Sequence, residues 1–577
     1  MSDTKEPSSS EENPTEQRAD GKSPTATPKK PVMMADEKRG PIRNGLESFG
    51  MAVLMAVLLK YFLLEAYVIP TPSMQPTMMG SPEAGESDRI LVDKLYYMLH
   101  EPKRWDIAVF RYPVRQVQSY VKRIVGIGGD RLKIAGGNLY NISKDGKTQT
   151  TLRKPARIQQ TLWREMYPMR RKLELFGTTT DTDSVPEKGD VFGRHFRGRR
   201  EQFWKIDPDD GAFIGTPTSG NTLRLSYNEV RNNYTDGYDL AVADILRKER
   251  TDTGTLAVTD LAIEFELTPT NKPDKVKVDI EISPLGVTFS LGVANGQGRL
   301  TAVRTTMPAK TVQSELFPFE IAAGATTSIR FEHLDDRLIA YRDGDLIQDL
   351  DTDDIPIVAD ITTNAEVAKE TEAVLGKVVP RITVVGKGSS KFGEVTIERD
   401  LHYTHSFLEN DYIIEVPEGH FFMMGDNTLG SADGRDWTAI KIGVDDKGNI
   451  VDPDDSANSG ARVLWGNKRP KAFGSTDDPH DDDNPVPMET RDRVVFVDEM
   501  GEIHSLHGKV DTKAWANQFE TFPRGRVQFM IGSGPGAKSF TPKQKPARFV
   551  PRSHIQGRPV ARFLRSISRF KITSWIR

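Results

Sequence analysis

The amino-acid sequence predicts a mainly β fold with one N-terminal transmembrane helix and an inserted β-sandwich domain. The 47 glycines and 36 prolines among 577 residues are typical of a chain rich in strands and loops. Several short runs also alternate apolar and polar residues, which is the periodicity of half-buried strands. The net charge of −4 gives no indication of nucleic-acid binding, and the absence of cysteine excludes disulfides and a thiol nucleophile.

The N-terminal 64 residues predict a tail followed by a membrane anchor. Residues 1–44 are rich in Ser, Thr, Pro, Glu and Lys, which is typical of a disordered tail. Residues 45–64 are apolar apart from Glu47 and Lys60, and about 20 helical residues span the ~30 Å hydrocarbon layer. A buried core helix is the alternative. Cations precede this stretch and few follow it, so we expect a cytoplasmic N-terminus and the residues after the anchor on the outer (periplasmic) side of the cell membrane.

The segment that follows the anchor places two hydroxyl side chains in a proline frame. Pro70, Pro72 and Pro76 disfavour a helix and predict an extended path. Thr71 and Ser73 are two residues apart, so an extended chain would point both side chains the same way. On its own, the segment is equally typical of a proline-rich linker.

A second segment places a lysine among apolar residues. Residues 106–113 form an apolar strand-type run, and residues 119–130 follow soon after. Strand alternation would put Tyr120, Lys122 and Ile124 on one face, where burial would favour the neutral amine that a general base requires. A solvated edge strand is the alternative.

A third segment, residues 416–437, reads as an apolar strand that runs into a loop rich in Gly, Asp and Ser. Such residues are typical of turns, and rigid scaffolds often carry functional groups on loops of this kind. Asp433 and Arg435 are expected to pair and fix the loop, although a plain turn is the alternative.

Taken together and in this order behind one span, the segments resemble bacterial type I signal peptidase, also called leader peptidase. Residues 69–78 resemble the family's Ile-Pro-Ser-Gly-Ser-Met-x-Pro-Thr-Leu, and residues 120–130 its Tyr-x-Lys-Arg-x-Val-Gly-x-Pro-Gly-Asp. Residues 425–435 resemble Gly-Asp-Asn-Arg-x-Asn-Ser-x-Asp-Ser-Arg, and residues 106–113 match a further block. The resemblance implies a signal-peptidase-type antiparallel β core and a serine endopeptidase that cleaves signal peptides from secretory preproteins with small residues at −1 and −3.

The resemblance also implies roles for individual residues. Ser73 would be the nucleophile and Lys122 the general base, without metal or cofactor. Thr71 would stabilise the oxyanion together with the Ser73 N–H, and Ser431 would orient the lysine amine. The residues expected to shape the site are Asp426, Asp433 and Arg435, and those expected to line the substrate pockets are Tyr67, Ile69, Met74, Tyr120 and Val121.

Three positions depart from the family pattern. Thr428 replaces an arginine, so we expect a second ion pair, involving Asp426, to be lost. Gly434 replaces a serine, and Gly128 replaces a proline, which is expected to loosen a turn.

The resemblance is interrupted twice. Its expected core parts are residues 65–154, 401–437 and 546–577. The first insertion, 155–400, has alternating runs in its second half and an Asp343-Gly344 hairpin signal, and it loosely resembles a concanavalin-like or laminin-G-type jelly roll. The second, 438–545, contains an acidic linker at 477–483.

Two interpretations compete with the peptidase. One is a membrane-tethered binding protein whose sandwich binds a glycan or protein while its peptidase core is degenerate. The other is a self-cleaving Ser/Lys peptidase of the repressor type. The retained Ser73, Lys122 and Ser431 argue against the first, and the single span argues against the second. Expected partners are therefore preproteins and membrane lipid, with a glycan or protein partner for the insertion as a further possibility.

Overall fold

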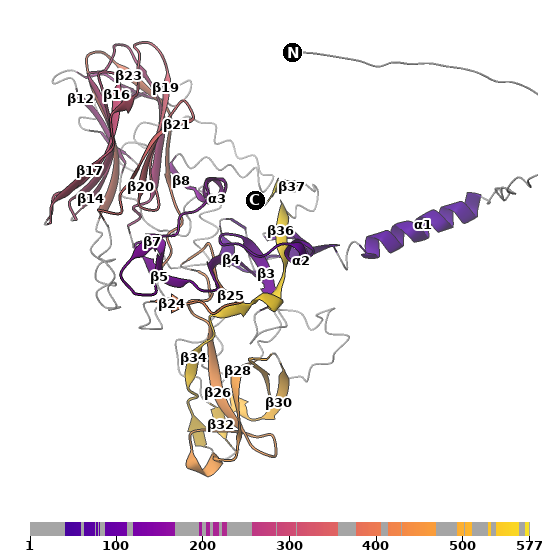
Figure 1. Ribbon diagram of the computed structural model, residues 1–577. Coiled ribbons are helices and arrows are strands. Elements are labelled where there is room, and N and C mark those ends of the chain that lie inside the picture. The colour runs from indigo at the N-terminus through magenta and orange to yellow at the C-terminus, as the bar shows by residue number, and fades with distance from the viewer. Residues whose placement is uncertain are drawn as a thin grey trace, which may run out of the picture. The chain divides into compact units, whose positions relative to one another are not determined.

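The computed structural model describes the parts of the chain that form its helices, strands and most connecting turns. The described residues are 41–58, 63–75, 77–78, 80, 87–111, 119–167, 196–198, 204–207, 212–217, 222–227, 257–283, 285–306, 308–355, 377–404, 413–428, 430–468, 493–500, 502–510, 529–531, 538–564 and 572–575. The fold is mainly β, as the sequence predicts, and all named strand pairs are antiparallel (Figure 1).

The chain divides into two compact units, one up to Leu58 and one from Leu59 onward. Helix α1 (Pro41–Leu58) is the described part of the first unit, so its first turn extends into the predicted disordered tail. Proline suits the first position of a helix, where its missing N–H is not needed. Among the described residues, no helix is both long and apolar enough to cross a membrane.

The predicted helix 45–64 extends too far at its C-terminal end. Leu64 is instead the first residue of strand β1 (Leu64–Val68), where it pairs with Asp93. Tyr67 and Val68 favour a strand, and an ion pair between Glu65 and Lys94 (2.7 Å) joins the strand to the end of its neighbour. Residues 59–62 of the predicted span lie outside the described residues.

An eight-stranded sheet forms the centre of the region that resembles signal peptidase. Its order is β1-β2-β36-β3-β4-β25-β35, with β37 paired to β36. The strands after β1 are β2 (Asp88–Asp93), β3 (Ile107–Arg111), β4 (Ser119–Ile127), β25 (His420–Met424), β35 (Phe549–Pro551), β36 (Ile555–Leu564) and β37 (Ile572–Trp575). Strand β36 comes from the far end of the sequence, yet it lies between β2 and β3.

A four-stranded sheet, β24-β5-β6-β7, completes this region. Its strands are β5 (Arg131–Ala135), β6 (Asn138–Ile142), β7 (Gln149–Thr151) and β24 (Ile414–Glu415). Two short helices accompany the sheets: α2 (Tyr96–Leu99) and α3 (Ala156–Leu162). Apolar side chains from both sheets share a core that includes Val125, Leu132, Ile134, Phe422 and Met424.

The first insertion is a two-sheet sandwich, as the alternating runs predict (Figure 1). One sheet has the order β10-β11-β23-β13-β19-β20-β21, with β8 on β23, and the other has the order β17-β16-β15-β14-β22-β12-β9, with β18 on β16. One apolar cluster contains buried residues of both sheets, such as Phe265 and Phe331 from one and Val278 and Phe289 from the other. Asp343 and Gly344 both have positive φ values of 53° and 87°, which confirms the predicted hairpin turn.

The strands of the first sheet of the sandwich are β8 (Arg164–Tyr167), β10 (Trp204–Ile206), β11 (Phe213–Gly215), β13 (Leu261–Pro269), β19 (Thr327–His333), β20 (Arg337–Arg342), β21 (Asp345–Asp351) and β23 (Ser390–Arg399). Those of the second are β9 (Phe196–Gly198), β12 (Thr222–Tyr227), β14 (Lys275–Ser283), β15 (Val287–Ala294), β16 (Gln297–Arg304), β17 (Lys310–Gln313), β18 (Phe317–Pro318) and β22 (Lys377–Val385).

The second insertion has its own small sheets. A five-stranded path, β27-β26-β28-β29-β30, has β34 paired to β26, and a separate sheet has the order β31-β32-β33. The strands are β26 (Thr438–Val444), β27 (Ile450–Val451), β28 (Arg462–Lys468), β29 (Arg493–Asp498), β30 (Ile503–His507), β31 (Lys509–Val510), β32 (Phe529–Ile531), β33 (Lys538–Phe540) and β34 (Gln544–Pro546). The acidic run 477–483 lies outside the described residues.

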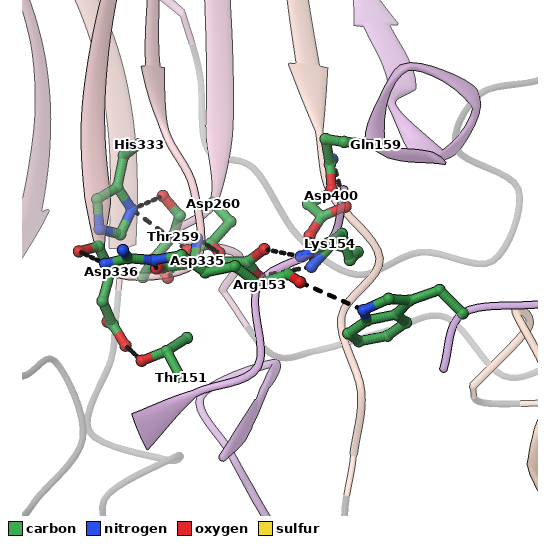
Figure 2. Close-up of polar contacts among 11 residues, drawn as sticks. Thr151, Arg153, Lys154, Gln159, Thr259, Asp260, His333, Asp335, Asp336 and Asp400 are labelled. Atoms are coloured by element: carbon green, nitrogen blue, oxygen red, sulfur yellow. Dashed lines mark hydrogen bonds and ion pairs between the residues drawn. The ribbon is translucent and has the colours of Figure 1, made fainter. Parts of the chain in front are cut away.

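Buried charges join the sandwich to the chain that leads into it (Figure 2). The Lys154 ammonium lies 2.5 Å from an Asp335 carboxylate oxygen and 2.8 Å from one of Asp400, and all three side chains are almost fully buried. Gln159 of α3 donates to Asp400 (2.7 Å), and Thr151 at the end of β7 donates to Asp336 (2.8 Å). These aspartates lie at the ends of sandwich strands, so the junction depends on paired charges inside the protein.

Candidate active site

Ser73 lies in a single 3-10 turn, η2 (Pro72–Met74), and not on the extended path that the prolines predict. Pro72 takes the first position of the turn, where its fixed φ is already suitable. Thr71 precedes the turn in an extended conformation, and its Oγ1 lies 3.2 Å from Ser73 Oγ, within hydrogen-bond distance. The two hydroxyls therefore lie together as predicted, although a turn brings them there.

Lys122 lies on β4, and its side chain is buried with 2% of its surface exposed. It pairs in register with Ala108 of β3. Strand β4 contacts the η2 turn that carries Ser73. The structure thus places the buried amine on the strand adjacent to the hydroxyl pair.

The third predicted segment follows β25 and is fixed by a buried ion pair. Arg435 Nε and Nη2 donate to the two carboxylate oxygens of Asp433 at 2.7 and 2.8 Å, so the expected pair is present. Burial opposes ionisation of Asp433, but the charge and hydrogen bonds of Arg435 outweigh it and lower the pKa of Asp433, with Lys122 adding a smaller effect. Asp433 also accepts from the Gly425 N–H (2.9 Å), which ties the two ends of the loop together.

Asp426 is paired, contrary to the expectation that its ion pair is lost. Arg123 donates to both of its carboxylate oxygens, at 2.8 and 2.7 Å, and both side chains are buried. Thr428, which stands where the family has an arginine, donates to the His402 carbonyl instead. The ion pair is retained because its cation comes from the residue directly after Lys122.

Gly425 is the point where the Ser73 turn and the third segment meet. A Cβ atom at this position would overlap the Ser73 carbonyl oxygen and the Ser431 hydroxyl. The next residues bind the turn directly: Asn427 donates its backbone N–H to the Ser73 carbonyl (3.1 Å) and its side-chain amide to the Pro72 carbonyl (3.0 Å). The Ser431 hydroxyl is buried and forms no hydrogen bond with the described residues.

Four of the five residues predicted to line substrate pockets lie in one apolar cluster. Ile69 and Met74 are buried in it, and Tyr67 and Val121 pack against it. Tyr120 lies in another cluster, where its ring packs edge-on against Trp437 at a centroid distance of 6.2 Å. Neighbouring strand residues point to opposite faces, which separates Tyr120 from Val121.

The two glycine departures have little space around them. A Cβ atom on Gly434 would lie 2.7 Å from the Phe422 ring and 2.9 Å from the Met423 carbonyl, so a serine would not fit here without movement. The turn that contains Gly128 is held by Asp130, which accepts from the Ile127 N–H (2.7 Å) and pairs with Arg104 (2.8 Å). The carboxylate of Asp130 thus supplies restraint where the sequence predicts a looser turn.

His402 is a buried histidine whose backbone carbonyl accepts a hydrogen bond from Thr428 of the third segment. We expect the His402 side chain to make the free energy of unfolding pH-dependent. Burial, aided by the charge of Arg399, lowers the pKa of His402 to about 4. Between about pH 6.5 and pH 4 the unfolded chain therefore binds more protons, and the stability present above pH 6.5 is lost as the pH falls. Wild type should lose about 2 kcal/mol more than His402→Gln between pH 7 and pH 5, measured by urea unfolding.

The exposed His100 supplies the control for this measurement. His100→Gln should keep the wild-type pH dependence. Equal slopes for wild type and His402→Gln would contradict the assignment.

Besides Arg123, sequence reasoning missed three residues that support the site. Asn427 lies within the third motif but was assigned no role. Thr77 and Arg164 form a hydrogen bond of 2.9 Å next to Asp426. Arg164 lies outside every motif, so no local signal in the sequence identifies it.

The region thus contains a Ser/Thr hydroxyl pair, a buried lysine on the adjacent strand and a loop that carries a buried serine. The family model for signal peptidase, peptidase S26, matches residues 42–193 and 357–451. The gap between these ranges contains strands β9 to β21 of the sandwich. The chain is thus similar to signal peptidases in two parts that together cover less than half of its length.

Curated relatives agree with the family match. The chain is 28% identical over 129 residues to signal peptidase I of Leptolyngbya laminosa, covering 21% of this chain and 60% of the relative. It is 35% identical over 92 residues to that of Aquifex aeolicus (16% and 34%) and 40% identical over 132 residues to that of Mycobacterium tuberculosis (17% and 45%). The chain thus spans between about a third and three fifths of the length of these relatives.

Solved structures match the chain at low similarity. Carbohydrate binding module CBM66 from Bacillus subtilis is 13% identical with a TM-score of 0.20, covering 34% of this chain and 90% of that chain. Beta-agarase B from Zobellia galactanivorans is 12% identical with a TM-score of 0.24, covering 35% and 80%. Such scores carry no argument about the ligand of the sandwich.

Proposed function

We propose that this chain is a serine endopeptidase that removes N-terminal signal peptides from exported preproteins, with Ser73 as nucleophile and Lys122 as general base. The observation that carries the proposal is that two segments distant in sequence, the Ser73 turn and the loop that begins at Gly425, meet at Gly425. The Ser73 turn, the buried Ser431 hydroxyl and the loop fixed by Asp433 all contact this residue or its backbone. The peptidase S26 match covers the same segments.

Acylation follows from these positions. The neutral Lys122 amine accepts the proton of the Ser73 hydroxyl as its oxygen attacks the scissile carbonyl. Burial disfavours the charged form of the Lys122 amine. The negative charge of Asp433 favours the charged form, but its pairing with Arg435 offsets much of that charge. The Ser431 hydroxyl, which is buried beside Gly425 and has no hydrogen bond among the described residues, is available to orient the amine.

The tetrahedral intermediate places negative charge next to Thr71. The Thr71 hydroxyl and the Ser73 N–H stabilise that oxygen, and Lys122 then donates its proton to the departing amine. This step releases the mature protein and leaves the signal peptide as an ester on Ser73. Lys122 next deprotonates a water molecule, which hydrolyses the ester and restores the free hydroxyl.

Substrate choice and location complete the proposal. The apolar cluster around Ile69 and Met74, next to the hydroxyl pair, accepts small side chains at −1 and −3. The apolar stretch that begins at Gly45 associates with the cell membrane, with the N-terminus in the cytoplasm and the site on the outer side. A signal peptide emerging from the membrane then lies near Ser73.

The proposed function is tested with a preprotein that carries an Ala-x-Ala site in detergent micelles. The full chain should cut after the second Ala, as mapped by mass spectrometry, and should leave a preprotein with Phe at −1 uncut. A mock purification from the same host controls for contaminating peptidase. Failure to cut several such preproteins would refute the proposal.

Gly425 offers a separate test of the site's assembly. Gly425→Ala should lower kcat by about 10²-fold, because the added methyl overlaps a backbone oxygen of the Ser73 turn and displaces it by a fraction of an ångström or more. Gly460→Ala is the matched control, since no atom lies within 4 Å of a Cβ added there. Equal activity of the two variants would show that the Ser73 turn does not depend on this contact.

A further inference from the structure

Arg164 is a buried cation at the start of β8, with 1% of its surface exposed. Its Nη2 donates to Thr77 Oγ1 at 2.9 Å, and its Nη1 lies 3.5 Å from the Thr161 carbonyl in the last turn of α3. Thr77 is only four residues after Ser73. A residue on the strand that leads into the sandwich thus contacts the segment that carries the hydroxyl pair.

Thr77 also contacts the third segment, at Asp426. Its hydroxyl donates to Asp426 Oδ2 at 2.5 Å, and Arg123 holds the same carboxylate with two hydrogen bonds. Burial opposes ionisation of Asp426, but the charge and hydrogen bonds of Arg123, followed by the charge of Arg164, lower its pKa. Asn427, the next residue, holds the Pro72 and Ser73 carbonyls. Asn427 therefore holds the Ser73 turn directly, and Thr77 holds the segment that follows the turn.

The sandwich determines where Arg164 lies. Strand β8 pairs with β23, and Arg164 is directly opposite Arg399 in that register. Helix α3, immediately before Arg164, is bound to Asp400 through Gln159, and Lys154 at its entrance is bound to Asp335 and Asp400. Both segments that flank Arg164 are thus attached to the inserted domain.

We propose that Arg164 is a positioning residue through which the docked sandwich holds the Ser73 turn in its reactive geometry. Arg123 already pairs with Asp426, and the first insertion supplies a second cation, Arg164, to the same network through Thr77. Arg164 acts through Thr77, which lies four residues after Ser73. Its effect is on how often the hydroxyl is correctly placed, and so on kcat more than on KM.

The kinetic test rests on the proposed peptidase function. Arg164→Met removes the donor at nearly constant volume and should lower kcat by about 10- to 100-fold with KM within about threefold. Arg164→Lys should recover part of the loss, because it keeps the charge. Thr77→Val should lower kcat by a similar factor. The double variant of Arg164→Met and Thr77→Val should be no slower than either single variant, because both substitutions break the same series of contacts between Arg164 and the Ser73 turn.

A second measurement does not need peptidase activity. The chain has no cysteine, so Ser73→Cys creates a single thiol at the nucleophile position. In this background, the rate of modification by methyl methanethiosulfonate should change severalfold on adding Arg164→Met, because the turn that buries position 73 is loosened. Arg157→Met, which alters an exposed arginine on α3, should leave that rate unchanged.

The outcomes separate the two proposals. A thiol rate that changes with Arg164→Met but not Arg157→Met supports the positioning role, even if no preprotein is cut. A preprotein that is cut equally well by wild type and Arg164→Met, with equal thiol rates, overturns the positioning role and leaves the peptidase intact. Matching thermal unfolding of the Arg164 variants and wild type excludes global unfolding as the cause.

Discussion

Signal-peptide cleavage is expected to fall by about 10³-fold or more when Lys122 is replaced by methionine. Methionine fills the buried site but cannot accept a proton, so the Ser73 hydroxyl remains a weak nucleophile. Ser73→Ala should be equally inactive, and the double variant should be no worse, because the two side chains act as one unit. Lys122→Arg should also be inactive, since a guanidinium stays charged. The rate is followed on an Ala-x-Ala preprotein under single-turnover conditions.

Lys133 provides the matched control for Lys122. It is a second lysine in the core, on β5, and is 1% exposed, but its ammonium donates to Gln149 (3.0 Å) away from the Ser73 turn. Lys133→Met should keep the wild-type kcat. Cleavage by Lys122→Met or Ser73→Ala at the rate of Lys133→Met would show that the nucleophile and base are assigned wrongly.

Replacing Lys154 by methionine should destabilise the folded chain by about 3–5 kcal/mol, because Asp335 and Asp400 would be left buried without their cation (Figure 2). Burial raises the pKa of Asp335 to about 6 even in the presence of Lys154. An acid whose pKa is raised in the folded state binds more protons there than in the unfolded chain. The free energy of unfolding therefore rises as the pH falls through the raised pKa toward the pKa of the unfolded chain. Removal of the Lys154 charge should raise the pKa of Asp335 further, so Lys154→Met gains more stability than wild type as the pH falls, and its deficit should shrink between pH 7 and pH 5 in urea unfolding.

Lys144→Met is the control for this charge removal, because Lys144 is exposed a few residues earlier. It should change stability by no more than about 0.5 kcal/mol. Adding Asp335→Asn to Lys154→Met should recover part of the loss, since one of the two uncompensated carboxylates is then removed. If Lys154→Met is as stable as Lys144→Met, the buried charges do not hold the sandwich.

Local patterns were sufficient to predict several strands in the second half of the first insertion, whereas β8 to β12 of the sandwich lie in its first half, where no sandwich strand was predicted. Residues 261–267 and 276–282 alternate apolar and polar side chains because one face of each strand packs in the core, and that constraint is visible in a short window. The Asp343-Gly344 turn is similarly local, because it requires two residues that tolerate positive φ.

The errors have a common physical origin in long-range contacts. The end of the predicted membrane helix was misplaced because β1 forms only when β2 supplies hydrogen bonds to Leu64 and its neighbours. The ion pair of Asp426 was expected to be lost because only residues of the loop that contains Asp426 were considered as its partner. The actual partner, Arg123, is 303 positions away in the sequence. Arg164 was missed for the same reason: its contact with Thr77 joins residues that are 87 positions apart in the sequence.

The location of β36 inside the core sheet has a consequence for the order of biosynthesis. Residues 555–564 pair with β2 on one side and with β3 on the other, so those two early strands have no partner on these edges until the late segment is made. Both insertions have been synthesised by then and can fold locally, while β2 and β3 still have an unpaired edge. A chain stalled before residue 555 would therefore carry the proposed nucleophile and base in a sheet that lacks the strand between β2 and β3.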